Sequence, residues 1–229
     1  RMQAGARVRG LSLSTQGGTL VLLDRKYEPL GNAISWLDTR AMETVSELTA
    51  RLPARDVYHA TGWTMLGGLA MPSAFWMAKV EPQRLEEAAY VASTPDYLHY
   101  KLTGRFALDK SNLALTEFLD LSTGDVWHDA LEAVGLRRAQ FAEVVDAGTP
   151  LGTLTPGAAR ELGLSGDTVV VAGAHDQYCA NLGAGATNPG DCVLSTGTAW
   201  ALLATTTELR FNDKSLASDG VTGAVYPGV

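Results

Sequence analysis

The chain has 229 residues, of which 46% are hydrophobic and 19% are charged, and its formal net charge is −7. This size and composition suit one large or two small domains with a buried core. The negative charge argues against nucleic acid or an anionic membrane as a partner, and the longest apolar runs are too short to cross a bilayer. The four histidines have no metal-ligand spacing. Cys179 and Cys192 fit a reduced, cytoplasmic protein, in which we expect both to be buried.

The hydropathy pattern predicts alternating strands and helices. At the amino-terminal end, residues 8–14 and 18–24 predict two strands, and Thr15-Gln16-Gly17 between them is either a turn or a substrate loop. Residues 39–52 predict an amphipathic helix that Pro53 ends. Further helices are expected at 74–79 and 85–89, separated by Pro82, then at 96–102, at 129–134, and at 156–162 behind a Thr155 cap. The sequence has no linker or repeat, so we expect one domain.

One acidic residue lies where a predicted buried strand gives way to a helix. The β-branched run at 169–171 leads through small residues to Asp176, and 177–182 suits a helix. At the carboxyl end of a strand, a carboxylate faces the crevice in which open α/β sheets bind ligands. At a helix N-terminus, the helix dipole favours the charged form of that carboxylate. Asp176 is therefore a candidate general base, and a plain helix cap is the alternative.

Residues 191–204 predict two strands joined by a tight turn. The turn, Ser195-Thr196-Gly197-Thr198, offers hydroxyl groups and closely approachable backbone N–H groups. Such turns can bind anions, but they are also ordinary hairpin turns. The order of the segments favours a functional interpretation of both: strand, Asp176, helix, glycine-rich loop and hairpin.

At this point the chain resembles the amino-terminal domain of the FGGY carbohydrate kinases, a family that includes glycerol kinase and xylulokinase. Ala174-His175-Asp176-Gln177 resembles the family's Gly-Asp-Gln-type segment, whose Asp is the catalytic base, and Gly197-Thr198 resembles its phosphate turn. Three more matches follow the family's order: Trp36-Leu37-Asp38-Thr39-Arg40 resembles Trp-x-Asp-x-Arg, 96–104 resembles Asp-Tyr-Leu-x-x-x-Leu-Thr-Gly, and 109–116 resembles Asp-x-Ser-Asn-x-x-x-Thr. Each match is short, but their common order makes the set specific.

The resemblance implies a fold and an activity. The fold would be a ribonuclease-H-like α/β domain of the actin-like ATPase superfold, with a mixed sheet, helices on both faces, and inserted helices between Trp63 and Leu136. The activity would be ATP-dependent phosphorylation of a sugar or polyol hydroxyl, with Mg²⁺ bridging the phosphates of ATP and no residue assigned as a metal ligand. The implied site residues are Asp176 as general base, Gln16, Trp36, Asp109 and Asn112 for the substrate, and Gly197 and Thr198 for the nucleotide phosphates.

Several of the substrate positions have alternative interpretations. Glycerol kinases resemble Gln-Arg-Glu and xylulokinases Gln-Met-His at the substrate loop, whereas this chain has Gln16-Gly17-Gly18. The two glycines leave more room, remove a contact, or form a plain tight turn. Asp38 and Arg40 are either substrate contacts or a helix cap with a solvated charge. Asp109 and Asn112 either bind sugar hydroxyls or cap the segment that follows them.

Residues 1–229 resemble the sugar-binding domain of a two-domain kinase, without the family's first phosphate hairpin and its carboxy-terminal nucleotide domain. We therefore expect this chain alone to bind its sugar weakly and ATP barely, and to transfer no phosphoryl group. An exposed apolar face, with self-association as a homodimer, is also expected. Two other classes stay open. One is a non-catalytic module that binds a sugar or a partner, and the other is a different actin-like protein, which would lack the motifs at 36–40 and 109–116.

Overall fold

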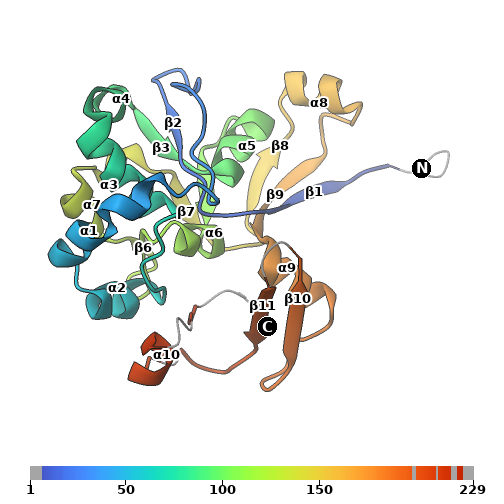
Figure 1. The fold of residues 1–229 in the computed structure, drawn as a ribbon. Helices are drawn as coiled ribbons and strands as arrows, with labels where there is room; N and C mark the ends of the chain where they lie inside the picture. Colours follow the sequence, from blue (N-terminus) through green and yellow to red (C-terminus); the bar gives the residue numbers. More distant parts are fainter. Residues whose placement is uncertain (1–6, 198–199, 210, 218–220, 224–229) are drawn as a thin grey trace.

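The structure is a computed structural model that describes residues 7–197, 200–209, 211–217 and 221–223. Figure 1 shows a helical body, a sheet that extends from it toward the amino terminus, and a carboxy-terminal hairpin beside both. Strands and helices are mixed along the chain, as the sequence predicts, with a run of consecutive helices from η1 to α4.

A mixed three-stranded sheet links the amino-terminal strand to the later half of the chain. β1 (Gly10–Thr15) pairs in parallel with β9 (Val169–His175), and β8 (Pro150–Thr153) pairs antiparallel with the other edge of β9. β9 is therefore the central strand, and its valine run suits a strand that is covered by its neighbours. The predicted mixed sheet is confirmed.

The remaining strands among the described residues form separate pairs. These pairs are β2 (Val21–Leu23) with β3 (Tyr90–Ala92), β4 (Ala107–Asp109) with β7 (Glu143–Val145), β5 (Leu119–Asp120) with β6 (Asp125–Val126), and β10 (Cys192–Thr196) with β11 (Trp200–Ala204). The β4–β7 pair is parallel, and the other three pairs are antiparallel.

Short helices fill the spaces between these strands. They are η1 (Arg40–Thr44), α1 (Val45–Arg51), α2 (Ala54–Thr61), α3 (Ala70–Val80), α4 (Pro82–Glu87), α5 (Thr94–Thr103), α6 (Lys110–Leu115), α7 (His128–Val134), η2 (Arg138–Gln140), α8 (Pro156–Leu162), α9 (Asp176–Gly183) and α10 (Asp213–Ala217). The helices α3 to α7 lie between Trp63 and Leu136, where the sequence predicts inserted helices. Of the helices in the described residues, none is long and apolar enough to span a membrane.

The structure corrects three details of the sequence prediction. The predicted helix at 39–52 divides into a 3-10 turn and α1, which ends before Pro53 as expected. The sequence predicts that Pro82 only separates two helices, but Pro82 begins α4, because proline fits the first helical turn. Cys192 is exposed and Cys179 is only partly buried, so the expectation that both are buried is wrong. Both cysteines lie after β9 in the sequence, in a part of the chain where few of the described residues are buried.

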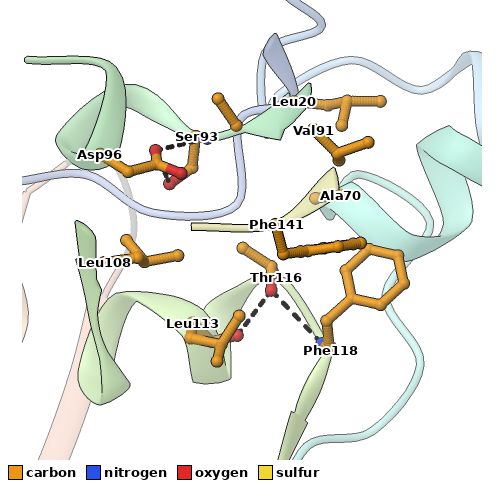
Figure 2. Close-up of a pocket in the computed structure, with 11 residues that line it drawn as sticks. Leu20, Ala70, Val91, Ser93, Asp96, Leu108, Leu113, Thr116, Phe118 and Phe141 are labelled. Carbon is orange, nitrogen blue, oxygen red and sulfur yellow. Dashed lines mark hydrogen bonds between the residues drawn. The ribbon is translucent and has the colours of Figure 1, made fainter. Parts of the chain in front are cut away.

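Helix α3 lies at the centre of the hydrophobic core. Every residue from Ala70 to Met77 is buried, so the first two turns of this helix are covered on all sides. Beside it, Phe118 and Phe141 pack edge to face with their ring centroids 4.9 Å apart. Figure 2 shows the void that these rings border. The void has a volume of about 10 Å³, which is close to the smallest space that holds one water molecule. None of the predicted site residues lines this void.

A buried carboxylate holds the start of α5 next to the same void. Asp96 Oδ1 accepts hydrogen bonds from Ser93 N at 2.7 Å and from Ser93 Oγ at 3.0 Å (Figure 2). Burial raises the pKa of Asp96 to about 7, and the donated hydrogen bonds oppose this rise. This reciprocal capping by Ser93 and Asp96 fixes the first turn of α5. It thereby positions Thr94, whose hydroxyl accepts a hydrogen bond from Gln16 in the predicted substrate loop.

Candidate active site

The candidate site forms where two parallel strands end side by side. Thr15, the last residue of β1, lies opposite His175, the last residue of β9. Gln16 and Asp176 follow these two residues, so both leave the same edge of the sheet. The predicted position of Asp176, between a buried strand and a helix, is confirmed.

The carboxylate of Asp176 is not occupied by helix capping. His175 holds the N-cap position of α9, no side-chain cap hydrogen bond forms there, and Asp176 lies in the first turn. Asp176 Oδ1 is buried without a hydrogen-bond partner, while 43% of the whole side chain is exposed. The structure therefore does not support the plain-cap interpretation, and it leaves Oδ1 without a hydrogen bond beside the positive end of the helix dipole. A role for Asp176 as general base stays a prediction.

A glycine lets β1 and β9 approach closely just before this carboxylate. The register between the two strands is irregular between Ser12 and Ser14, and there Gly173 lies against the backbone of Leu13. A Cβ atom at position 173 would overlap the Leu13 carbonyl group. Only glycine permits such a backbone contact, so Gly173 sets how deeply His175 and Asp176 lie.

The start of α6 is built around Asp109. This side chain accepts hydrogen bonds at Oδ1 from the backbone N–H groups of Ser111 and Asn112, both at 3.1 Å, and from the Ser111 hydroxyl. Its Oδ2 accepts a bond from Asn112 Nδ2 at 2.7 Å. Asp109 and Asn112 are fully buried. The capping alternative is therefore what the structure contains, and a direct sugar contact by either residue stays a prediction.

Two hydrogen bonds attach this helix start to the ends of both strands. The backbone N–H of His175 donates to Ser111 Oγ at 2.9 Å, and Thr15 Oγ1 donates to Asn112 Oδ1 at 3.4 Å. Asp109, through Ser111, and Asn112 thus hold the last residues of β9 and β1 in place. Sequence reasoning placed Thr15 in a turn or substrate loop and Ser111 in the Asp-x-Ser-Asn motif, but it assigned neither side chain a role in the site.

Threonine side chains hold the amide of Gln16 from two sides. Gln16 Nε2 donates to Thr94 Oγ1 at 2.7 Å, and Gln16 Oε1 accepts from Thr19 Oγ1 at 3.0 Å. The backbone N–H of Trp36 lies 3.4 Å from the same Thr19 oxygen, to which it donates. The structure therefore brings the predicted residues Gln16 and Trp36 together through Thr19. The sequence placed Thr19 in the substrate loop and Thr94 at the start of a helix, but it assigned neither side chain a role in the site.

The two glycines after Gln16 do not leave open space. A Cβ atom on Gly17 would lie 2.8 Å from the Leu115 side chain, and one on Gly18 would lie 2.6 Å from Leu69. Gly18 also has φ +80°, a conformation that favours glycine. Leucine side chains therefore fill the volume that larger loop residues would need, and the interpretation that the glycines leave more room is wrong.

Asp38 and Arg40 pair with each other. Arg40 Nε donates to Asp38 Oδ1 at 2.9 Å, and the Arg40 guanidinium lies 5.2 Å from the ring centroid of Trp76. Hydrogen bonding to Arg40 lowers the pKa of Asp38. This local pairing fits the alternative of a solvated charge pair, and contact with a substrate stays a prediction.

The predicted phosphate turn falls partly outside the described residues. Gly197 is exposed at the end of β10, and Thr198 lies outside the residues that the structure describes. Figure 1 shows α9, which begins at Asp176, beside the β10–β11 hairpin. In the described part of the chain, no group of three or more His, Cys, Asp or Glu side chains could hold a metal ion. Phosphate binding by Gly197 and Thr198 stays a prediction.

The family model for the FGGY family of carbohydrate kinases, N-terminal domain, matches residues 3–183. The chain therefore belongs to the FGGY family of carbohydrate kinases. The matched range includes Gln16, Trp36, Asp109, Asn112 and Asp176, and the hairpin with Gly197 follows it.

Individual relatives agree with this assignment. The autoinducer-2 kinase of Photorhabdus laumondii is 34% identical over 196 residues, which are 84% of this chain and 37% of that protein. The xylulose kinase of Rhodospirillum rubrum has a TM-score of 0.87 at 26% identity, over 93% of this chain and 43% of that one. The glycerol kinase of Plasmodium falciparum, solved with ADP, has a TM-score of 0.75 at 22% identity, over 83% of this chain and 38% of that one. The predicted actin-like ATPase fold is confirmed, and the chain spans less than half the length of these proteins.

Proposed function

We propose that the full-length protein transfers the γ-phosphoryl group of ATP to a hydroxyl of a sugar or polyol, and that this domain supplies the acceptor site. One observation carries the proposal: in a chain of this family, Asp176 and Gln16 directly follow the paired last residues of β9 and β1, and Asp176 Oδ1 accepts no hydrogen bond. The names of the relatives, which include an autoinducer-2 kinase and a glycerol kinase solved with ADP, support a phosphorylated small acceptor and ATP as donor.

In the proposed reaction, Asp176 is the general base. The acceptor hydroxyl attacks the γ-phosphorus while its proton passes to the Asp176 carboxylate, and the bond to the bridging oxygen of ADP breaks. The amide of Gln16 would hydrogen-bond an acceptor hydroxyl, because Thr94 and Thr19 fix its orientation. Trp36 would form a wall of the acceptor pocket, and Asp109 and Asn112 would position the site through Ser111 and Thr15.

The phosphates would meet the β10–β11 hairpin at Gly197 and Thr198. Mg²⁺ would neutralise charge on the phosphates. The residues described here form no metal site of their own, so we assign no residue to the ion.

The isolated chain would bind an acceptor weakly and release no ADP, because a second domain would supply the remaining phosphate contacts.

We also propose a cytoplasmic protein without a nucleic-acid or membrane partner, which suits a net charge of −7. Self-association through the exposed hairpin is a further proposal. Membership of a kinase family favours catalysis over the alternative of a non-catalytic binding module.

Release of ADP from the full-length protein, measured across a panel of ketoses, aldoses and polyols, tests the activity. With the best acceptor, Asp176→Asn should lower kcat by roughly 10²–10⁴-fold, the usual contribution of a positioned general base, and should change KM less. Asp129→Asn is the matched control, because Asp129 also follows a histidine in the first turn of a helix. Turnover of Asp176→Asn within a few-fold of wild type would remove Asp176 as the base. No ADP release with any acceptor would refute the kinase proposal.

A further inference from the structure

His175 places an unused nitrogen next to the carboxylate of Asp176. His175 Nδ1 lies 3.3 Å from Asp176 Oδ1. Both atoms are buried, and neither has a hydrogen-bond partner of acceptable geometry. Two buried polar atoms that face each other without a hydrogen bond are costly, so this pair requires an explanation.

The surroundings of the imidazole indicate which of its nitrogens carries the proton. The backbone carbonyl of Thr15 hydrogen-bonds the ring, and Nδ1 has no partner, which leaves Nε2–H as the donor to Thr15. A neutral imidazole has one N–H and one lone pair, so Nδ1 carries the lone pair and lies 3.3 Å from Asp176 Oδ1. The backbone bond to Ser111 and the edge of the Tyr178 ring, 5.4 Å between centroids, hold the imidazole in this place.

The charged groups around the ring are both acidic. Burial lowers the pKa of His175, while the carboxylates of Asp176 and Asp109 oppose that decrease. The imidazole of His175 is therefore neutral until a proton reaches the His175–Asp176 pair. When a proton reaches the Asp176 carboxyl group, it can satisfy Nδ1 and Oδ1 at once.

We propose that His175 is a positioning residue that receives, on Nδ1, the proton that Asp176 takes from the acceptor hydroxyl. This inference rests on the proposed function of Asp176. The electrons of the hydroxyl O–H bond form the new O–P bond, and the proton moves to the carboxyl group. Rotation of that group about its Cβ–Cγ bond then presents the proton to Nδ1, which leaves an imidazolium beside a restored carboxylate. The imidazolium returns its proton to solvent before the next turnover.

The protonation of His175 can be measured in the 229-residue chain without any substrate. Long-range ¹H–¹⁵N NMR distinguishes the two ring nitrogens, and single His→Gln variants assign the signals of the four histidines. At pH 8 we expect His175 to carry its proton on Nε2, and at lower pH to gain a second proton on Nδ1. Asp176→Asn should move this second protonation about one to three pH units lower, because it removes the adjacent anion. Asp129→Asn should leave His175 unchanged.

Two NMR results would overturn the inference. One is a proton on Nδ1 at pH 8, because Nδ1 would then already be a donor to Asp176. The other is a His175 titration that Asp176→Asn does not alter. Unchanged ¹H–¹⁵N signals of β1 and β9 in the variant show that the fold is intact, so a loss of structure cannot be mistaken for either result.

Kinetics of the full-length protein add a second, separate test. His175→Gln retains an N–H for Thr15 but has no equivalent of Nδ1, so kcat should fall about tenfold with little change in the acceptor KM. His128→Gln should have wild-type kinetics. An unchanged kcat in His175→Gln overturns the inference even if Asp176 proves to be the base. Full activity in Asp176→Asn instead refutes the proposed base, whatever the NMR titration of the pair.

Discussion

The chain contains the dipeptide His-Asp twice, and each copy lies at the start of a helix. In His128–Asp129, at the start of α7, Nδ1 and Oδ1 lie 3.8 Å apart and the side chains are 87% and 67% exposed. In His175–Asp176, where α9 begins, the same atoms lie 3.3 Å apart and the side chains are 11% and 43% exposed. The residues are the same, and the difference is their access to water.

The difference arises from what precedes each helix. β6, before α7, has two residues and one partner strand. β9, before α9, is paired on both edges, and α6 bonds to its last residue through Ser111. Water screens the exposed pair, whereas the buried pair interacts in a medium of lower dielectric constant. The fold thus removes much of the solvent from one copy of the dipeptide and leaves the other in water. The following predictions test this comparison.

Gly173→Ala should have the largest effect, because it removes the close approach that buries the second pair. The new Cβ would meet the Leu13 backbone, which cannot move without breaking the pairing of β1. We expect the free energy of unfolding, measured with urea, to fall by about 3 kcal/mol or more. Gly183→Ala in α9, where a Cβ meets nothing within 4 Å, is the control and should be neutral or slightly stabilising. Wild-type stability of Gly173→Ala would mean that β1 does not set the burial of His175.

Ser111→Ala should have the next largest effect. It leaves the buried N–H of His175 without an acceptor and Asp109 without one of its donors. The expected loss in the free energy of unfolding is about 1–3 kcal/mol, measured by thermal or urea unfolding. Ser122 is a matched control, because its hydroxyl donates to Asp120 two residues earlier, at 2.6 Å, on the exposed surface. Equal losses in both variants would show that burial does not distinguish these two serines.

The buried His175 should make the protein less stable in acid. The pKa of His175 in the folded chain is lowered below its ordinary value of 6.5. Below about pH 6.5 the unfolded chain therefore binds a proton that the folded chain does not, and the free energy of unfolding falls by up to about 1.4 kcal/mol per pH unit.

His175→Gln should reduce this acid-dependent loss, and His128→Gln should not. The measurement is urea unfolding between pH 8 and pH 5. His99 is also buried with a lowered pKa, but it contributes equally in both variants and cancels from the comparison. The same pH dependence in His175→Gln as in wild type would contradict the prediction.

Leu202→Ser should have the smallest effect on stability. Leu202 and Trp200 on β11 are 71% and 75% exposed, and no described residue beyond Ala186 is buried. The substitution should change the free energy of unfolding by less than about 0.5 kcal/mol. It should instead weaken self-association of the chain, measured by sedimentation velocity, because exposed apolar patches drive association. A concentration-independent monomer in wild type would refute the proposed self-association.

Local features of this fold could be predicted from the sequence. The valine run before Asp176 identified β9, because a short apolar β-branched segment is typical of a covered strand. Thr155, Pro156 and Gly163 correctly marked the ends of α8, because capping depends on residues within one turn. The predicted helix at 39–52 failed in its first turn, where the chain instead forms a 3-10 turn.

The sequence by itself determined the alternation of strands and helices, the family motifs, and the location of Asp176 between β9 and α9. Only the tertiary structure decided which groups meet there, through hydrogen bonds that join residues far apart in the chain. His175 bonds to Ser111 across 64 positions, Gln16 to Thr94 across 78, and Thr15 to Asn112 across 97. Propensity and capping act between neighbours in sequence, whereas burial and hydrogen bonding of a side chain depend on segments that folding brings together. For this reason the sequence could identify Asp176 as a candidate site residue, but only the fold could show that His175 is buried and His128 is exposed.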